Sequence, residues 1–141
     1  MGEIVVARIK KGDIPRVWRL ARPFVKRALR YADGQMAPDH VLAELLADRA
    51  QLWFVWDRKA RELLGVATTQ VVKFPLKQIL RVITVAGTDG HRWDGKLDEA
   101  LTAYAQGLGI RKLDAIGRRG LERRLEPLGW KAEAIIVGKE I

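Results

Sequence analysis

Gln78-Ile-Leu-Arg-Val-Ile-Thr-Val-Ala86 is dominated by β-branched and apolar residues, which predicts a strand. Gly87-Thr-Asp-Gly-His-Arg-Trp-Asp-Gly95 follows as a loop with three glycines. From Lys96 onward, apolar residues recur at helical spacing as far as Leu108, which predicts a helix. A strand, a glycine loop and a helix in this order direct backbone N–H groups and a positive helix end towards an anion. Ordinary strand-to-helix junctions also need such a turn, so the flanking sequence must decide between an anion-binding loop and a simple connection.

Length and composition predict a single domain over residues 1–141. The chain is 48% hydrophobic but has no apolar run long enough for a transmembrane helix. Its start, Met1-Gly-Glu-Ile-Val-Val-Ala7, already has a strand-like pattern and lacks the basic region of a signal peptide. These features predict a cytoplasmic protein without membrane contact. Because the chain has no cysteine and only two histidines, His40 and His91, we expect neither thiolate chemistry nor a metal site.

The first predicted helix, residues 15–32, has an apolar face and a strongly basic face. Asp13 is expected to cap the helix and Pro23 to kink it. The basic face carries Arg16, Arg19, Arg22, Lys26, Arg27 and Arg30. No acidic residue interrupts it, and the whole chain has a net charge of +9, so these like charges repel each other. We therefore expect this face to contact an acidic protein or a nucleic acid. The alternative is that it is only the solvent-exposed side of the helix.

The remainder of the chain predicts alternating strands and helices. A strand at 3–10 precedes the first helix, and a short helix at 38–48, with His40 exposed and Leu46 inward, follows it. Further strands are expected at 51–56, 63–74, 78–86, 112–116 and 132–140, and further helices at 96–108 and 121–126. Trp18, Trp53 and Trp56 are expected in core or sheet positions. The predicted fold class is therefore α/β, a three-layer mixed β-sheet with helices on both faces.

Three segments resemble the GNAT acyltransferase superfamily: Ala7-Arg-Ile-Lys-Lys-Gly-Asp-Ile-Pro15, Leu63-Leu-Gly-Val66 and Leu125-Glu-Pro-Leu-Gly-Trp130. They are similar to the family's first strand and helix, to a strand with a hydrophobic-x-Gly step, and to its late Tyr-x-x-Leu-Gly-Phe ending. The order of predicted elements agrees over essentially the whole chain. The finer resemblance is to a GNAT-like group encoded by phages and prophages, and it rests on Trp18, Asp57 to Gly65, Arg92-Trp93 and Gly117-Arg-Arg-Gly120.

The resemblance implies binding of acetyl-CoA or another acyl-CoA. In the family, the central loop holds the pyrophosphate, and the pantetheine arm lies between the strands that here end near Ala86 and Ile116. The implied cofactor-binding residues are Val85, Ala86, Gly87, Gly90, His91, Arg92 and Lys96. Only Gly90 fits the family's glycine pattern, because Arg92 stands where a second glycine is expected. A backbone N–H near Val85 or Ala86 is expected to stabilise an oxyanion.

The resemblance also implies catalytic groups that this sequence lacks. The family's usual proton donor is the tyrosine of the late motif, and the matching residue here is Leu125, which cannot donate a proton. No carboxylate lies between Leu63 and Thr88 to act as a general base. His91 and Tyr104 remain as catalytic candidates, although Tyr104 also fits a core position.

The sequence leaves two classes of function open. The first is an acyl-CoA-dependent N-acetyltransferase homologue with degenerate catalytic residues. The second is a non-catalytic structural or interaction module, for instance a phage component in the host cytoplasm or the virion. Nucleic-acid binding is a third option that rests on charge alone, since the chain contains no DNA-reading motif. Homo-oligomers and assembly into a larger complex also stay open.

Overall fold

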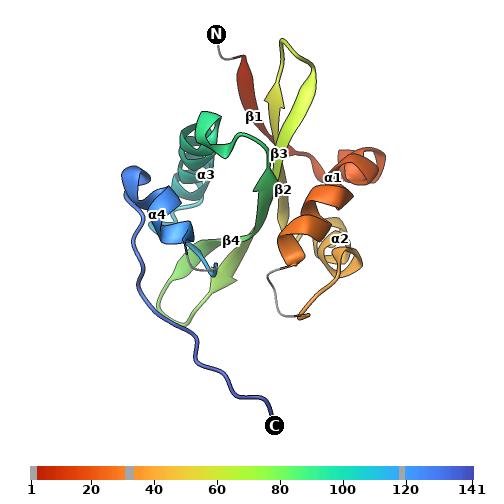
Figure 1. Ribbon diagram of the computed structural model, residues 1–141. Helices are drawn as coiled ribbons and strands as arrows, with labels where there is room; N and C mark the ends of the chain where they lie inside the picture. Colours follow the sequence, from red (N-terminus) through yellow and green to blue (C-terminus); the bar gives the residue numbers. More distant parts are fainter. Residues whose placement is uncertain (1–2, 31–33, 118–119) are drawn as a thin grey trace.

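The computed structural model describes residues 3–30, 34–117 and 120–141 (Figure 1). In chain order its strands and α-helices are β1 Ile4–Ile9, α1 Ile14–Leu29, α2 Pro38–Leu46, β2 Gln51–Asp57, β3 Glu62–Lys73, β4 Gln78–Gly87, α3 Asp94–Gly107, β5 Leu113–Ala115 and α4 Leu121–Leu125. Short 3-10 turns lie at Lys11–Asp13, Gly90–Arg92 and Glu126–Leu128. The five strands form a sheet in the order β1-β2-β3-β4-β5. Its neighbours are antiparallel except β4 and β5, which are parallel.

Helices cover both faces of the sheet, as Figure 1 shows: α1 and α2 lie on one side, and α3 and α4 on the other. Residues of β2 alternate between the two faces, and a bulge at Leu64 shifts the alternation in β3, so each face has its own core. Leu52, Phe54 and Val66 pack with α1 and α2. Trp53, Val55, Leu64 and Ala67 pack with α3. The predicted three-layer α/β fold with a mixed sheet is confirmed.

Helix α1 forms as the apolar spacing predicts. Its buried residues Ile14, Ala21, Val25 and Leu29 recur at intervals of seven or four residues and face the sheet. The helix continues through Pro23. It was predicted to reach Ala32 but ends at Leu29, and residues 31 and 32 lie outside the described residues. Asp13 occupies the expected N-cap position, but it makes no side-chain cap bond and its carboxylate pairs with Arg16 one turn later.

The second helix is shorter than predicted. Helix α2 ends at Leu46, which is 40% exposed and not inward as expected. His40 is exposed, as predicted, and has a capping role: its Nδ1 accepts a hydrogen bond of 2.9 Å from the Ala37 N–H, one of the orphan donors of the first turn. Trp53 is buried, whereas Trp18 and Trp56 are half-buried at the margin of the α1-side core.

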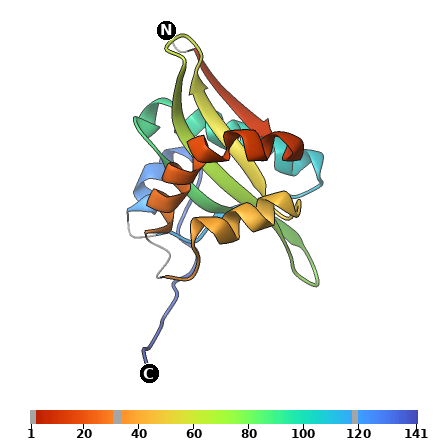
Figure 2. The same ribbon diagram turned by 90° about the vertical axis from the view of Figure 1, so that its right-hand side faces the viewer.

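The predicted last strand is wrong. Residues 132–140 contain no strand and are exposed throughout. Figures 1 and 2 both show the chain leaving the body of the molecule after α4. The composition of the segment favours a strand, but a strand needs a neighbour for its backbone groups, and none of the described strands runs beside it.

Candidate functional site

The site is built where β4 and β5 separate. The two strands pair at only three positions, from Leu80 with Leu113 to Val82 with Ala115. Strand β5 ends there, while β4 continues to Gly87. The last part of β4 therefore has β3 on one side and an edge without a strand on the other.

A β-bulge in β4 coincides with this separation. Thr84 pairs with Thr68 and Val82 pairs with Thr69, so Ile83 is an extra residue without a partner on β3. The Thr88 N–H bonds to the Leu64 carbonyl on β3 at 2.9 Å. Since N–H groups alternate between the two sides of a strand, the Val85 N–H points to the open side. Of the two donors predicted for an oxyanion, this geometry favours Val85 over Ala86.

A small cavity lies beside this open edge, between β4, β5, α3 and α4. Its volume is about 50 Å³. The side chains around it are mostly apolar and comprise Val82, Val85, Asp94, Leu97, Asp98, Leu101, Ala115, Leu121, Arg124, Leu125 and Trp130. Leu125, which stands at the position of the family's tyrosine, thus contributes a methyl-bearing side chain to the cavity and no proton donor. Trp130 is fixed there by a hydrogen bond of 2.8 Å from its Nε1 to Asp98.

The loop after β4 is fixed by Trp93, to which the sequence analysis assigned no packing role. Gly65 and Gly87 pair across β3 and β4, and together they leave a slot for its indole ring. A Cβ on Gly65 would lie 2.7 Å from the Trp93 ring, and one on Gly87 would lie 2.3 Å from the Leu64 carbonyl oxygen. The ring is 1% exposed, and its Nε1 donates to the Thr88 carbonyl at 2.7 Å. Gly87, predicted as part of a cofactor cradle, therefore has a packing role.

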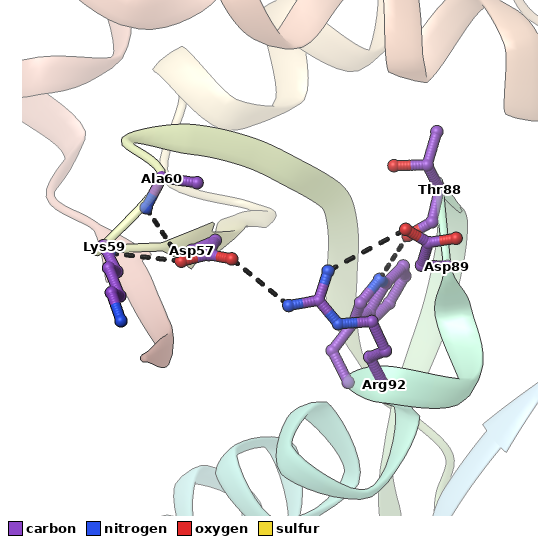
Figure 3. Close-up of polar contacts among 7 residues, drawn as sticks. Asp57, Lys59, Ala60, Thr88, Asp89 and Arg92 are labelled. Atoms are coloured by element: carbon purple, nitrogen blue, oxygen red, sulfur yellow. Dashed lines mark hydrogen bonds and ion pairs between the residues drawn. The ribbon is translucent and has the colours of Figure 1, made fainter. Parts of the chain in front are cut away.

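Arg92 ties the same loop to the β2–β3 turn (Figure 3). Its guanidinium bonds to Asp57 at 3.2 Å and lies 3.8 Å from Asp89. The Asp57 carboxylate also accepts hydrogen bonds from the Lys59 and Ala60 N–H groups. The hydrogen bond from Ala60, followed by the one from Arg92, lowers the pKa of Asp57. Arg92 was predicted to contact a cofactor, and in the described structure it has two carboxylate partners.

Arg124 of α4 occupies the place where the loop meets α3. Its guanidinium makes two hydrogen bonds of 2.6 Å to Asp94, the first residue of α3, and lies 5.7 Å from the centre of the Trp93 ring. A Cβ on Gly90 would come within 2.3 Å of the Arg124 Nη2. The hydrogen bonds to Asp94 raise the pKa of Arg124, which stays cationic. This cation beside the glycine loop was not visible in the sequence, because it comes from thirty residues further along the chain.

The other predicted residues are spread around the cavity and beyond it. His91 and Lys96 are exposed, and neither lines the cavity. Tyr104 lies further along α3, in an edge-to-face contact of 5.3 Å between ring centres with Trp53, and the Arg8 guanidinium lies 5.1 Å above its ring. Its ring is therefore part of the α3-side core. The structure brings together Val85 and Leu125 but leaves His91 and Tyr104 apart from them.

Buried polar groups surround the bulge, and no sequence pattern indicated them. The Thr68 and Thr84 hydroxyls lie 2.6 Å apart, and both side chains are buried. Below the bulge, Arg81 of β4 makes a bidentate pair with Asp114 of β5, with distances of 2.9 and 3.0 Å. This pair joins the two strands at the middle of their three paired positions, just before they separate. Finding it needs the register of two strands that are far apart in the chain.

The basic face of α1 lies on the other side of the sheet from the cavity (Figure 1). All six of its Arg and Lys residues are exposed, and Arg16 pairs with Asp13. Within the described ranges, every helix is too short or too polar to traverse a bilayer. The same ranges contain no group of three or more His, Asp or Glu side chains placed to share a metal ion.

The five-strand mixed sheet with helices on both faces matches the fold of GNAT acyltransferases. No protein-family model and no curated protein matches the sequence. The fold is instead recognised by comparison with solved structures, whose identities are low enough that the likeness establishes the fold alone.

Three of these structures illustrate the likeness. A predicted acetyltransferase from Clostridium acetobutylicum, solved with acetyl-CoA, has a TM-score of 0.70 at 12% identity over 97% of this chain and 96% of its own. Glucosamine-6-phosphate N-acetyltransferase from Arabidopsis thaliana has a TM-score of 0.69 at 12% identity, over 97% of both chains. An aminoglycoside acetyltransferase from an uncultured soil metagenomic sample, in complex with sisomicin, has a TM-score of 0.69 at 14% identity over 99% of this chain and 95% of its own. None of the three likenesses supports the resemblance to the phage-encoded group, which stays a prediction.

Proposed function

We propose that the protein binds an acyl-coenzyme A between β4, α3 and α4, as a homologue of N-acetyltransferases with degenerate catalytic residues. The observation that carries this proposal is the opening between β4 and β5 beside the bulge. There a free-edge N–H at Val85, an apolar cavity and a glycine loop at the start of α3 adjoin one another. One of the structurally similar acetyltransferases was solved with acetyl-CoA, which supports the choice of ligand.

The residues present fit such a ligand in three parts. Apolar side chains of the cavity, among them Leu97 and Leu101, suit a pantetheine arm. The first N–H groups of α3, together with Arg124, suit a phosphate, because a helix N-terminus and a guanidinium both attract anions. The Val85 N–H suits a thioester carbonyl oxygen. An acyl-CoA would supply an activated acyl group, and the chain itself supplies binding and orientation.

The site has one built-in obstacle to an anion. Asp94 stands at the N-terminus of α3 and holds the Arg124 guanidinium against Gly90. A phosphate that approaches the loop has to share Arg124 with this carboxylate. We expect Asp94→Asn to free the guanidinium and to strengthen coenzyme A binding, whereas Arg124→Gln weakens it.

One observation favours binding without catalysis. Leu125 lines the cavity where the family's proton donor is expected, and neither His91 nor Tyr104 lines it. General acid–base catalysis needs such a group within hydrogen-bond reach of the reacting atoms. We therefore propose little or no acyl transfer to peptide or polyamine amines. Release of free thiol above the hydrolysis rate with these acceptors would overturn this part of the proposal.

Calorimetric titration with acetyl-CoA and desulfo-CoA tests the binding proposal. Ala115→Leu adds methyl groups to the lining of the cavity, so we expect binding to weaken at least about tenfold, or roughly 1.4 kcal/mol. Ala103→Leu makes the same change on the exposed side of α3 and serves as the control, with affinity unchanged. No heat of binding with the parent protein, or equal affinity of both variants, would exclude this site.

A further inference from the structure

The inference concerns the part of the cavity wall that α4 provides, and it rests on the proposed function. Residues 120–130, here called the lid, comprise α4 and the 3-10 turn after it, and they end at Trp130. Figure 1 shows α4 on the same side of the sheet as α3. Four lid residues line the cavity: Leu121, Arg124, Leu125 and Trp130. The cavity of about 50 Å³ is far smaller than the roughly 300 Å³ at which small-molecule pockets begin, so an acyl-CoA arm needs it to widen.

The lid is the part of the wall that is held least firmly. Strand β4 pairs with β3 along most of its length, and α3 buries Leu97, Leu101 and Ala105 in the core. By contrast, every lid residue is exposed or half-buried, and none of them belongs to a strand. The free energy needed to move the lid is therefore smaller than that needed to move β4 or α3.

Two side-chain contacts hold the lid against α3. Arg124 makes two hydrogen bonds of 2.6 Å to Asp94, and the Trp130 Nε1 donates one of 2.8 Å to Asp98. The two carboxylates are four residues apart on α3, so they lie on the same face of that helix. Gly120 and Gly129, near the two ends of the lid, have φ of +95° and +91°, which glycine adopts without a steric cost. Such ends can absorb a rotation of the segment between them.

We propose that a ligand phosphate opens the lid by taking Arg124 from Asp94, and that the lid then closes over the bound arm. The guanidinium lies against Gly90, in the loop where a phosphate would approach the start of α3. A guanidinium binds phosphate with the same bidentate geometry as carboxylate, so it stays paired throughout the exchange. The exchange leaves the hydrogen bond of Trp130 as the only one of the two contacts. An apolar molecule without an anionic group cannot make this exchange, so the lid selects ligands that carry both a phosphate and an apolar arm.

The test uses the absence of cysteine from the chain. Leu101→Cys, here called the reporter, places one thiol at a cavity position that is 2% exposed. Its rate of reaction with a soluble disulfide reagent measures how often the lid opens, and Ala103→Cys on the exposed side of α3 gives the rate without a lid. Leu97→Cys, at a position 7% exposed, is the second reporter should the first fail to fold.

Inorganic pyrophosphate is the first probe, and we expect it to accelerate the reaction of the reporter thiol about tenfold. Arg124→Gln in the reporter should raise the basal rate and abolish the response to pyrophosphate. Asp98→Ala should accelerate the reaction about tenfold without any anion, because it removes a hydrogen bond to a charged group. Glu99→Ala makes the same change of charge at the next, exposed residue and serves as the control, with the rate unchanged.

Acetyl-CoA is the second probe and separates this inference from the proposed function. It should slow the reaction, because the bound arm fills the cavity beneath the closed lid. Slowing by acetyl-CoA without acceleration by pyrophosphate would overturn the lid and keep the proposed ligand. Acceleration by pyrophosphate without slowing by acetyl-CoA would support the lid and contradict the ligand. A response to pyrophosphate that persists in Arg124→Gln, or equal rates for Asp98→Ala and Glu99→Ala, would also overturn the lid.

Discussion

At the scale of single residues, the loop is organised by Trp93 and by the two glycines that make room for it. The indole is buried between β3 and β4, so the position of the loop depends on the absence of two Cβ atoms. Arg92 fixes the outer side of the loop through Asp57, and Arg124 covers its inner side. The loop is thus held by packing and ion pairs before any ligand binds.

Gly65→Ala is expected to destabilise the protein by about 1–3 kcal/mol, because the added methyl overlaps the ring of Trp93 in a packed site. Gly12→Ala, whose added methyl would meet no atom within 4 Å, should change stability by less than about 0.5 kcal/mol. Urea denaturation measures both. In combination with Trp93→Phe the cost of Gly65→Ala should shrink, since the smaller ring frees space. Fully additive costs would show that the overlap is not the cause.

Asp57 is expected to titrate below the ordinary carboxylic acid range of about 4, as measured by NMR of its carboxyl carbon. Its pKa is lowered in the folded protein, so its contribution to stability is complete above the ordinary value and is lost as the pH falls through the folded value. Arg92→Ala should raise the pKa of Asp57 only in part, because the Ala60 N–H is the larger cause. A midpoint at or above the ordinary value would contradict the hydrogen bonds described.

At the scale of elements, α1 and β4 show what sequence can predict. The periodicity of α1 and the β-branched run of β4 are local patterns, and both elements formed where they were expected. The loop between β4 and α3 was also located from its glycines. The slot for Trp93, the bulge at Ile83 and the contact of Arg124 with Gly90 depend on strand register and on chain segments far apart, which no local pattern encodes.

The last predicted strand failed for a related reason. Residues 132–140 have the composition of a strand, but pairing is a property of two segments, and the described chain supplies no second one. Leu125 was singled out from its place in the late motif as the residue in place of the family's tyrosine, and it lines the cavity. Sequence reasoning did not predict that His91 and Tyr104 lie apart from the cavity. Both are close in the sequence to residues of α3 that line it, but their own side chains do not reach it.

The basic face of α1 remains a proposal for an acidic partner. We expect Arg19→Glu/Arg22→Glu/Lys26→Glu to abolish binding of a labelled DNA duplex, used as a polyanion probe in fluorescence anisotropy, and to leave coenzyme A binding unchanged. Binding by the parent should weaken steeply with salt as counterions are released. The control Arg58→Glu/Lys59→Glu/Arg61→Glu alters three exposed residues of the β2–β3 turn with the same change in net charge. Equal loss in both variants would mean that net charge alone attracts the probe.

At the scale of the whole molecule, the two ends of the sheet are held with unequal strength. Strands β1 to β4 form long antiparallel ladders, whereas β5 is joined to β4 at three positions. In residues 113–117 and 120–130, side-chain pairs such as Arg81 with Asp114 and Arg124 with Asp94 supplement this short ladder. Sparse contacts of this kind allow local opening.

Hydrogen exchange is expected to show this inequality directly. Amides of residues 113–117 and 120–130 should exchange faster than those of β2 and β3 in the parent protein, because they open without unfolding the main ladders. Acetyl-CoA should slow their exchange, since the proposed ligand lies between β4 and α4. Uniform exchange across the chain would contradict the first expectation, and protection confined to α1 and α2 would contradict the second.

The bulge in β4 also sets the parity of the strand. Before Ile83 the even-numbered residues Leu80 and Val82 join the α3-side core, and after it the odd-numbered Val85 does so. Deleting Ile83 would remove the bulge and leave Val82, Thr84 and Val85 in plain alternation, so the residues beyond it would keep their faces. If Ile83 instead paired regularly with β3, the Thr84 side chain would move to the face of the apolar cavity, and Gly87 would turn away from Trp93. The bulge thus absorbs one residue, so that both halves of β4 present their apolar side chains to the same layer of helices.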